Sequence, residues 1–359
     1  MLLITISLCM IVKNEEDVIA RCLNSVKEAI DEIIIVDTGS TDRTKEIATS
    51  LGAKVYDFEW INHFAAARNF SFQQATSDYI MWLDADDVLM PEDLARLLEL
   101  KQREPFNYDT VTMKYNLAFD ENGKPTYSYR RNRLVKRSMN FEWIGPVHEY
   151  LSVYGSSFHS DIAVTHRKER HASNRNLDIY LARLEQGEEF TPRDQFYFAN
   201  ELRDHARYEE AIQWYDLFLE GKKGWVEDNI AACSRKAHCY AQLKQRELAI
   251  RSLLQTLEYT PPRPDFCYQL GSLFLHEKRY PEATYWYTQA LSTSKYMTDM
   301  SFHNPATATW LPHLQLTVCY DRMGNIEQAV EHHKQAKALN PNHPSIVYND
   351  NYYKKKGVL

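Results

Sequence analysis

Residues 80–87 read Ile-Met-Trp-Leu-Asp-Ala-Asp-Asp. The four apolar residues predict a short buried strand, and three carboxylates follow where that strand ends. Closely spaced carboxylates repel one another and need a compensating positive charge. A divalent cation supplies it, because hard cations take oxygen ligands and leave positions for substrate phosphates. The alternative is a solvated turn that caps a helix beginning at Pro91. The place at the end of a strand favours the metal site.

This stretch belongs to an alternation of strands and helices in the first half of the chain. We expect strands at residues 2–12, 32–36, 53–58 and 79–83, and helices at residues 14–29, 42–51, 65–75 and 91–103. Such an alternation builds a mostly parallel sheet covered by helices, and ligands bind beyond the carboxyl ends of its strands. Polar residues 13–15 and 37–40 stand at two further strand ends. We therefore expect one shared site at this edge.

Four segments of this half resemble family 2 glycosyltransferases, which have the GT-A fold. The segments are SLCMIVKNEE (7–16), IIVDTGSTD (34–42), AARN (66–69) and WLDADD (82–87), in the order and spacing of the family. The resemblance covers about residues 4–170. It implies a Rossmann-like α/β GT-A domain that takes a nucleotide sugar as donor and Mn²⁺ or Mg²⁺ as cofactor.

The resemblance also implies a role for single residues. Asp37 would hydrogen-bond the nucleobase, typically uracil. Arg68 would lie over the nucleotide and its diphosphate, and Asp84 would contact the ribose side. Asp86 would ligate the metal that bridges the diphosphate. Physical chemistry agrees, because a guanidinium suits phosphate and a metal stabilises the departing nucleoside diphosphate. Without the resemblance, Asp37 would be interpreted as a cap or Asx turn and Arg68 as a surface arginine.

Residues 143–149, Trp-Ile-Gly-Pro-Val-His-Glu, resemble a Gly-x-Val/Ile-His-Glu segment of many family 2 enzymes. An inverting transfer needs a general base that deprotonates the acceptor as it attacks the anomeric carbon. Glu149 is our candidate for this base. Asp87 and Glu142 are rival bases, and a structural role for Glu149 is the remaining alternative.

His166 follows the predicted strand at residues 162–165. Several GT-A enzymes supply a late histidine to the metal, and imidazole is a suitable ligand. His148 is the alternative ligand, and a purely structural histidine is another. Arg133 and the rest of the basic run 130–137 are candidates for binding the diphosphate, and a solvated strand face is the alternative.

Small residues recur through the second half of the chain, at Ala211, Ala249, Ala283 and Ala329. Another small residue stands twelve positions before each of them, at Ala199, Ala237, Gly271 and Thr317. The pattern resembles the tetratricopeptide repeat (TPR), a helix-turn-helix unit of about 34 residues. Such arrays offer concave binding surfaces, so we expect them to hold a peptide or protein acceptor or to form a homodimer. The alternative is that the repeats only stabilise the catalytic domain.

These patterns divide the chain into four parts. We expect the GT-A domain at residues 1–172, a linker with a capping helix at 173–194, all-α repeats at 195–345 and a tail at 346–359, frayed like many chain ends.

Composition restricts the partners. The formal net charge of -7 argues against a dedicated nucleic-acid binder. We expect no membrane span, because no stretch of about 20 apolar residues occurs. Six cysteines without a CxxC pair predict reduced thiols and a cytoplasmic protein.

The function we predict is an inverting, metal-dependent transfer of a hexose from a UDP-sugar to a peptide or protein, where inversion follows from the family resemblance. The combination with repeats resembles bacterial glycosyltransferases that modify bacteriocins on Cys or Ser. One alternative is a transferase of cell-surface glycan or lipopolysaccharide assembly, and another is a non-catalytic repeat scaffold. A sugar nucleotidyltransferase is disfavoured, because residues 13–16 contain no glycine for a phosphate loop.

Overall fold

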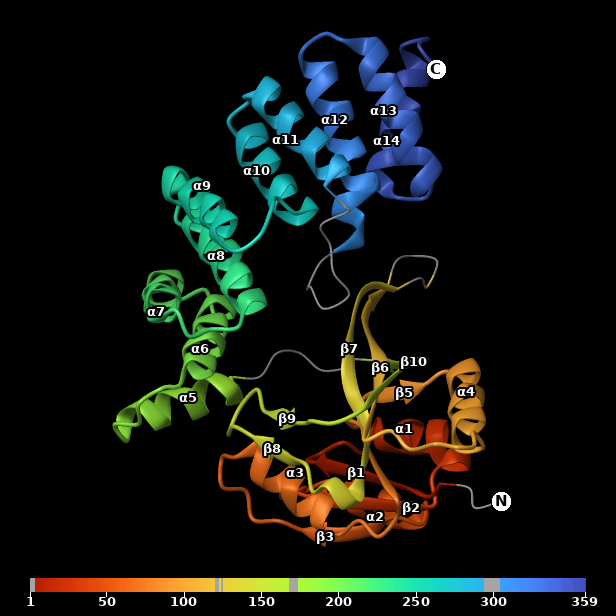
Figure 1. Cartoon of the computed structure of the whole chain (residues 1–359). Helices are drawn as coiled ribbons and strands as arrows, with labels where there is room; N and C mark the ends of the chain where they lie inside the picture. Colours follow the sequence, from red (N-terminus) through yellow and green to blue (C-terminus); the bar gives the residue numbers. More distant parts are fainter. Residues whose placement is uncertain (1–3, 120–122, 124, 168–173, 294–303) are drawn as a thin grey trace. The chain divides into compact units, whose positions relative to one another are not determined.

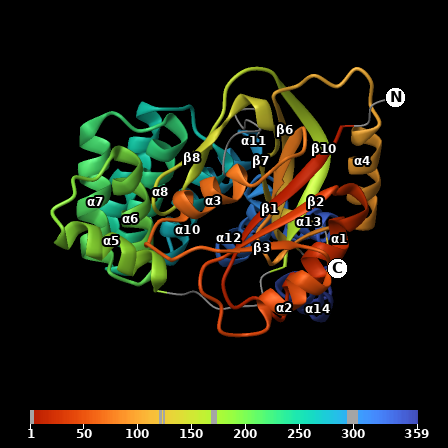
Figure 2. The ribbon, with the colours of Figure 1, turned by 90° about the horizontal axis from the view of Figure 1, so that it is seen from below.

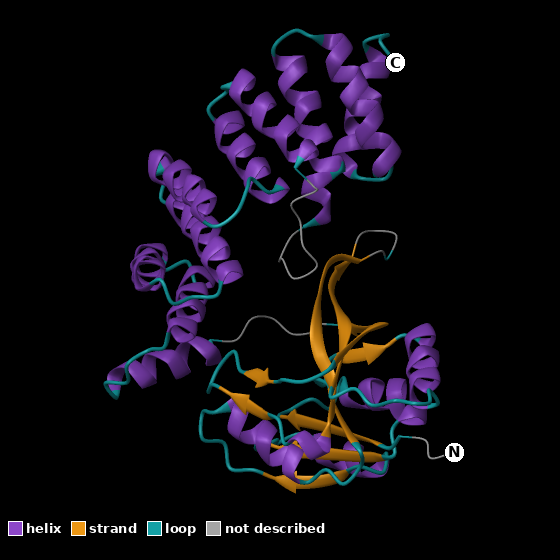
Figure 3. Cartoon of the chain, viewed as in Figure 1, coloured by secondary structure: helices purple, strands orange, loops and turns teal. Residues whose placement is uncertain are grey.

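The computed structural model describes residues 4–119, 123, 125–167, 174–293 and 304–359. The chain forms two compact units, residues 1–120 with 128–180 and residues 121–127 with 181–359. A large sheet with helices makes up the first unit, and helices dominate the second (Figure 1, Figure 3). The division falls within helix α5 (Arg175–Glu185). The boundary expected after residue 172 lies outside the described residues.

The sheet of the first unit has eight strands in the order β3-β2-β1-β4-β7-β6-β10-β5. Strand β1 pairs in parallel with β2 and β4, β2 with β3, and β6 with β10, whereas β7 and β5 are antiparallel to β4 and β10. Figure 2 shows β3, β2 and β1 side by side. The strand bounds are β1 Ile6–Val12, β2 Glu32–Asp37, β3 Lys54–Asp57, β4 Tyr79–Trp82, β5 Asp87–Leu89, β6 Thr110–Phe119, β7 Pro125–Lys136 and β10 Ser157–His166. A separate antiparallel pair consists of β8 (Glu142–Ile144) and β9 (Tyr150–Ser152). The mostly parallel α/β sheet expected from the sequence is confirmed.

Successive side chains of β1 point alternately to the two faces of the sheet, and helices pack against both faces. Leu8 and Met10 point into a core with helices α1 (Ile19–Val26), α2 (Thr44–Ser50) and α4 (Pro91–Lys101). Cys9, between them, joins a second core with helix α3 (Phe64–Gln73). Successive side chains of a strand point to opposite faces, so the uninterrupted apolar run of β1 is that of a strand covered on both sides. Two 3₁₀ turns complete this unit, η1 Lys27–Ala29 and η2 Arg137–Met139.

The second unit contains four successive helix pairs, α6–α7, α8–α9, α10–α11 and α12–α13 (Figure 1). Their bounds are α6 Pro192–Asp204, α7 Tyr208–Gly221, α8 Val226–Gln242, α9 Arg246–Leu254, α10 Pro264–His276, α11 Tyr280–Ser292, α12 Trp310–Arg322 and α13 Ile326–Leu339, with 3₁₀ turns η3 Gln255–Glu258 and η5 Pro305–Ala308. The recurring alanines 211, 249, 283 and 329 are all fully buried. The arrangement confirms the tetratricopeptide-type repeats expected from these small residues.

The end of the chain differs from the expected frayed tail. Residues 344–355 form helix α14 (Pro344–Lys355), which packs against α13. Ile346 and Tyr353 are buried, and Asp350 lies 3.2 Å from His333. The expectation was wrong because this segment buries apolar side chains against α13, although its last lysines are exposed. In the described part of the chain, the helices are too short or too polar to cross a membrane.

Candidate active site

Three loops meet at the carboxyl edge of the parallel strands. Strands β1, β2 and β4 run in the same direction, so the residues after them lie at one edge. The Asn14 amide donates to Ser40 Oγ at 2.9 Å, and the Thr38 amide donates to the Val12 carbonyl at 2.9 Å. The Cys22 thiol lies 3.5 Å from the Asp84 carbonyl. The single shared edge expected from the sequence is therefore present.

Asp37, the last residue of β2, is buried at this edge. Its Oδ1 accepts hydrogen bonds from the amides of Gly39 (3.0 Å) and Ser40 (2.8 Å). Its Oδ2 is also buried but has no hydrogen-bond partner among the described residues. A buried acceptor without a partner is energetically costly unless a ligand supplies the donor. Asp37 thus forms the local turn of the alternative interpretation and still keeps one oxygen for a ligand.

Arg68 of α3 connects two carboxylates that are distant in the sequence. Its Nη2 donates to Asp84 Oδ1 at 2.8 Å, and its Nε donates to Glu149 Oε1 at 2.6 Å. Its guanidinium carbon lies 5.1 Å and 4.8 Å from the ring centroids of Trp82 and Trp143, within the range of cation–π attraction. The side chain that the resemblance places over the diphosphate is therefore engaged with Asp84 and Glu149.

Positive charges surround Asp84. Burial alone would raise the pKa of the Asp84 carboxyl, but the charges of Arg68, Arg133 and Arg131 outweigh burial and hold the pKa well below its ordinary value. Asp84 is therefore ionised at neutral pH and can accept hydrogen bonds only.

Arg133 and Asp87 form an ion pair beneath the acidic loop. Arg133 Nη1 lies 3.0 Å from Asp87 Oδ2, and both side chains are fully buried. The guanidinium carbon lies 3.9 Å and 4.4 Å from the ring centroids of Trp82 and Tyr115. Arg133 is therefore unsuited to the diphosphate role considered for it from the sequence, because β7 carries it into the core instead of onto an exposed face.

His166 ends β10 directly opposite Asp87 in the antiparallel pair with β5. Its Nδ1 lies 3.4 Å from Asp86 Oδ1, 3.4 Å from Asp87 Oδ1 and 3.1 Å from the Tyr115 hydroxyl, which also donates to Asp87 Oδ1 at 3.0 Å. Hydrogen bonds to Asp86 and Asp87 raise the pKa of His166 to about 9. One potential ligand atom from each of Asp86, Asp87 and His166 lies within 4.8 Å of the others. The structure thus gathers a carboxylate–imidazole cluster that strongly stabilises a positive charge.

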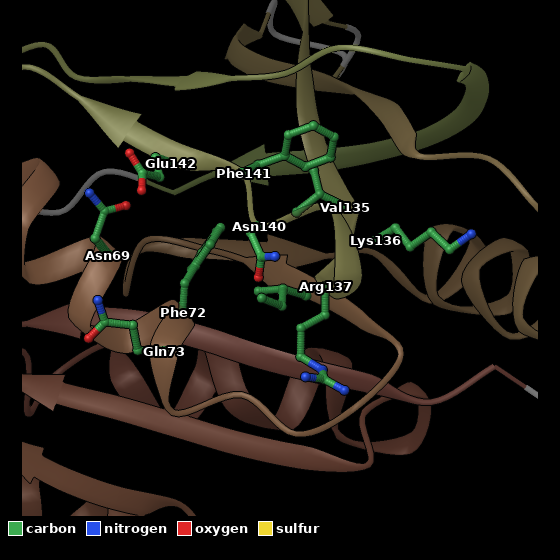
Figure 4. Close-up of a pocket in the computed structure, with 10 residues that line it drawn as sticks. Asn69, Phe72, Gln73, Val135, Lys136, Arg137, Asn140, Phe141 and Glu142 are labelled. Carbon is green, nitrogen blue, oxygen red and sulfur yellow. The ribbon is translucent and has the colours of Figure 1, made fainter.

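His148, the alternative metal ligand, and Glu142, a rival base, are not part of the Asp86–Asp87–His166 cluster. The His148 ring is parallel to the Tyr180 ring at 6.4 Å. Glu142 lines a pocket of about 350 Å³ with Gln73, Arg137 and Asn140 (Figure 4). Its carboxylate projects there toward the side chain of Asn69 (Figure 4).

Two more arginines lie in this region: Arg131, which the sequence indicated only as part of the basic run 130–137, and Arg175, which the sequence did not single out. Arg131 lies on β7, two residues before Arg133, and its guanidinium carbon is 5.2 Å from the Trp82 ring centroid. Arg175 opens α5 and lies over the Phe64 ring at 4.6 Å. Burial lowers the pKa of Arg175, although the nearby carboxylates of Glu149, Glu15 and Asp84 oppose this effect. Strand alternation was a usable signal for Arg131, because residues two apart share one face.

Residues 7–176 match the family model described as glycosyl transferase family 2. A TPR repeat-containing protein of Synechococcus elongatus is 42% identical over 145 residues, which are 40% of this chain and 34% of that protein. The SPbeta prophage-derived glycosyltransferase SunS of Bacillus subtilis is 31% identical over 235 residues, 61% of this chain and 54% of SunS.

An uncharacterized glycosyltransferase of Rickettsia typhi is 27% identical over 310 residues, 77% of this chain and 99% of that protein. The chain spans 34% and 54% of the lengths of the Synechococcus protein and SunS. The matched family model covers the sheet, the acidic loop and every candidate site residue. The domain formed by residues 7–176 belongs to glycosyl transferase family 2.

Proposed function

We propose that this protein is an inverting glycosyltransferase that moves a hexose from a UDP-sugar to a peptide or protein acceptor. Family membership supports the reaction class. The observation that carries the proposal is the pairing of Asp86 with His166 at the same sheet edge that holds Asp37 and Asp84. Inversion is the outcome that the family resemblance implies.

Asp37 and Asp84 are the proposed nucleoside contacts. The free Oδ2 of Asp37 would accept a hydrogen bond from the ring N–H of uracil. Asp84 is ionised and partly exposed, so it would accept hydrogen bonds from the ribose hydroxyls. Both residues lie at the sheet edge and offer carboxylate oxygens, which favours a donor with N–H and O–H groups.

A divalent cation fits the cluster around Asp86. The donors are a carboxylate and an imidazole, a set that suits Mn²⁺ and accepts Mg²⁺ less readily. The raised pKa of His166 shows that Asp86 and Asp87 favour positive charge at this position. Asp86 and His166 would hold the ion, while Asp87, already neutralised by Arg133, would orient His166. When bound, the metal would stabilise the negative charge of the departing nucleoside diphosphate.

Glu149 is the proposed general base. Its Oε1 accepts a hydrogen bond from Arg68 at 2.6 Å, and its side chain is 11% exposed. Asp87 is fully buried and paired with Arg133, so no acceptor can reach it. Glu142 lines the separate pocket of Figure 4. Of the three carboxylates considered, Glu149 is the one that pairs with Arg68, which also binds Asp84.

The proposed step is a single displacement at the anomeric carbon. An acceptor hydroxyl or thiol attacks this carbon while Glu149 takes the acceptor proton. The bond between the anomeric carbon and the β-phosphate oxygen breaks, and its electron pair stays on that oxygen. The products are the glycosylated acceptor, the nucleoside diphosphate and a protonated Glu149.

The repeats are the proposed acceptor platform, because stacked helix pairs offer concave surfaces for peptides. Assembly of a cell-surface glycan is the alternative acceptor chemistry, and dimerisation is the alternative use of the repeats. A scaffold without activity is disfavoured, since Asp84, Asp86 and His166 are all in place. The proposal includes a cytoplasmic location, which six buried free thiols support.

A donor panel tests the function. Purified protein is incubated with Mn²⁺ and UDP-, GDP- and CMP-sugars, with and without candidate peptides, and released nucleotide is measured. We expect metal-dependent release from a UDP-sugar and a lower selectivity for uracil in Asp37→Asn. Release from a GDP- or CMP-sugar alone would refute the assignment of uracil. If neither donor nor metal raised the melting temperature and no donor were turned over, the scaffold alternative would replace the proposal.

A further inference from the structure

Two arginines of β7 share one side of the strand but differ in their surroundings. Arg131 and Arg133 are two residues apart, so their side chains point to the same face. Both guanidinium groups lie over the same two aromatic rings. The guanidinium carbon of Arg131 lies 5.2 Å from the Trp82 ring centroid and 5.7 Å from the Tyr115 ring centroid. The guanidinium carbon of Arg133 lies closer to both, at 3.9 Å and 4.4 Å. Arg131 and Arg133 thus place two positive charges next to each other beside the acidic loop.

The deeper arginine has a fixed partner. Arg133 is fully buried, pairs with Asp87 at 3.0 Å and donates to the Trp82 carbonyl at 3.2 Å. Arg130, which faces the other side of the strand, donates to the Ser160 carbonyl at 2.7 Å. These contacts give both residues structural roles.

Arg131 has no such partner. Its guanidinium is half-buried over aromatic rings and makes no hydrogen bond or ion pair within the described ranges of the chain. Burial alone would lower the pKa of Arg131, but Tyr129 and Asp84 outweigh this and raise it. A half-buried guanidinium without a carboxylate partner is suited to an anionic ligand.

The charges of the site point to which anion this is. Most charged side chains at the sheet edge neutralise one another in two groups, namely Asp87 with Arg133, and Asp84 and Glu149 with Arg68 and Arg175. Asp86 and Asp37 are carboxylates outside these two groups that lie at this edge. A divalent cation on Asp86 and the guanidinium of Arg131 would together more than offset their two negative charges. The resulting excess of positive charge favours an anionic ligand such as the diphosphate of a nucleotide sugar.

We propose that Arg131 binds the diphosphate of the nucleotide-sugar donor. This inference rests on the proposed function and assigns the diphosphate contact to Arg131 in place of Arg68 and Arg133, which are engaged with carboxylates. Two N–H groups of a guanidinium match two phosphate oxygens. As the bond to the anomeric carbon breaks, the nucleoside diphosphate gains one further negative charge, which the same guanidinium stabilises.

Calorimetric titration tests the assignment. UDP with Mn²⁺, and uridine alone, are titrated into wild-type protein, Arg131→Gln, Arg131→Lys and the matched control Arg130→Gln. We expect Arg131→Gln to weaken UDP binding about ten- to hundredfold and to leave uridine binding unchanged. Arg131→Lys should recover part of the loss, and Arg130→Gln should bind as the wild type does. Equal UDP affinity in Arg131→Gln and wild type would overturn the inference and leave the proposed function standing. If the wild type bound neither UDP nor uridine, the proposed function would fail first.

A second measurement avoids variants altogether. Wild-type protein is treated with phenylglyoxal, and modification of Arg131 is followed by peptide mass spectrometry. We expect UDP with Mn²⁺ to protect Arg131 and uridine not to protect it. Modification at the same rate with and without UDP would contradict the inference, whether or not the Arg131 variants fold.

Discussion

The guanidinium of Arg133 lies 3.0 Å from the carboxylate of Asp87, and neither side chain is exposed to solvent. The Asp87 carboxylate also accepts two further hydrogen bonds from neighbouring groups. Asp87 Oδ2 also accepts the Asp84 amide at 3.1 Å, and Asp87 Oδ1 accepts the Tyr115 hydroxyl. The ion pair therefore fixes the backbone of the acidic loop from below and leaves Asp86 at its surface.

Removing the cation of this pair should destabilise the first unit. We expect Arg133→Met to lower the free energy of unfolding by about 3–5 kcal/mol, because an unpaired carboxylate is left in the core. Urea denaturation followed by circular dichroism measures the loss. The double variant Arg133→Met/Asp87→Asn should lose less than the two single variants together, since it buries no lone charge. Arg130→Met is the control on the opposite face of β7, and a loss equal to that in Arg133→Met would contradict this account.

Tyr115 should affect metal binding without being a ligand. Its hydroxyl contacts both Asp87 and His166, so Tyr115→Phe frees the imidazole to rotate. We expect Mn²⁺ affinity to fall about 10–100-fold, the range found when outer partners of metal ligands are removed. Titration with Mn²⁺ monitored by electron paramagnetic resonance reports the free ion. Tyr56→Phe, on β3, is the matched control, and unchanged affinity in Tyr115→Phe would remove this residue from the site.

Close packing of the repeats can be tested at Gly271. A Cβ atom there would lie 2.7 Å from Tyr287 Cε1 of the facing helix, so the two helices would have to separate. We expect Gly271→Ala to lower the free energy of unfolding by about 1–3 kcal/mol despite the better helix propensity of alanine. Gly221→Ala is the control, because a Cβ atom at that position meets nothing within 4 Å. Thermal unfolding of the two variants should move in opposite directions; destabilisation of both to the same degree would speak against the steric explanation.

The last repeat should be sensitive to acid. His313 and His332 face each other with their Nδ1 atoms 2.9 Å apart. Burial, together with the neighbouring His332, lowers the pKa of His313 to about 4. Because the folded-state pKa lies below the unfolded value, the stabilisation is complete above about pH 6.5 and is lost as the pH falls toward 4.

Replacing that histidine should flatten the pH profile. Between pH 6.5 and 4, the wild type should lose about 1–3 kcal/mol of its free energy of unfolding through this histidine, and we expect His313→Gln not to show this loss. Urea unfolding at a series of pH values measures the difference, and His276→Gln, an exposed histidine of α10, is the control. Parallel profiles for wild type and His313→Gln would show that this pair does not titrate as described.

Local patterns in the sequence were sufficient for the parallel strands of the sheet and for the edge at which they end. The apolar runs located β1, β2 and β4, and parallel strands then bring Asp37, Asp84 and Asp86 to one edge. The place of His166 beside Asp86 was also anticipated, because His166 ends its strand. The recurring alanines indicated the repeats for a similar reason, since close helix crossings need small residues.

Partners that are distant in the chain could not be predicted. Arg68 and Glu149 are 81 positions apart, and only the tertiary fold brings them within 2.6 Å. Alternation along β7 reveals that Arg131 and Arg133 share a face, but it does not show which of them is deeper. The difference arises from Asp87, which lies on another strand. The periodicity of a sequence therefore does not predict which charged side chains pair in the core.

The most direct test compares Asp86→Asn with the control Asp161→Asn, an exposed carboxylate on β10. Release of UDP from a UDP-sugar is measured for wild type and both variants across a Mn²⁺ titration. We expect Asp161→Asn to release UDP as the wild type does. In Asp86→Asn we expect the rate of release to fall more than about tenfold and half-maximal release to require more Mn²⁺. Equal rates and equal Mn²⁺ dependence in Asp86→Asn and wild type would contradict a metal-assisted transfer at this edge of the sheet.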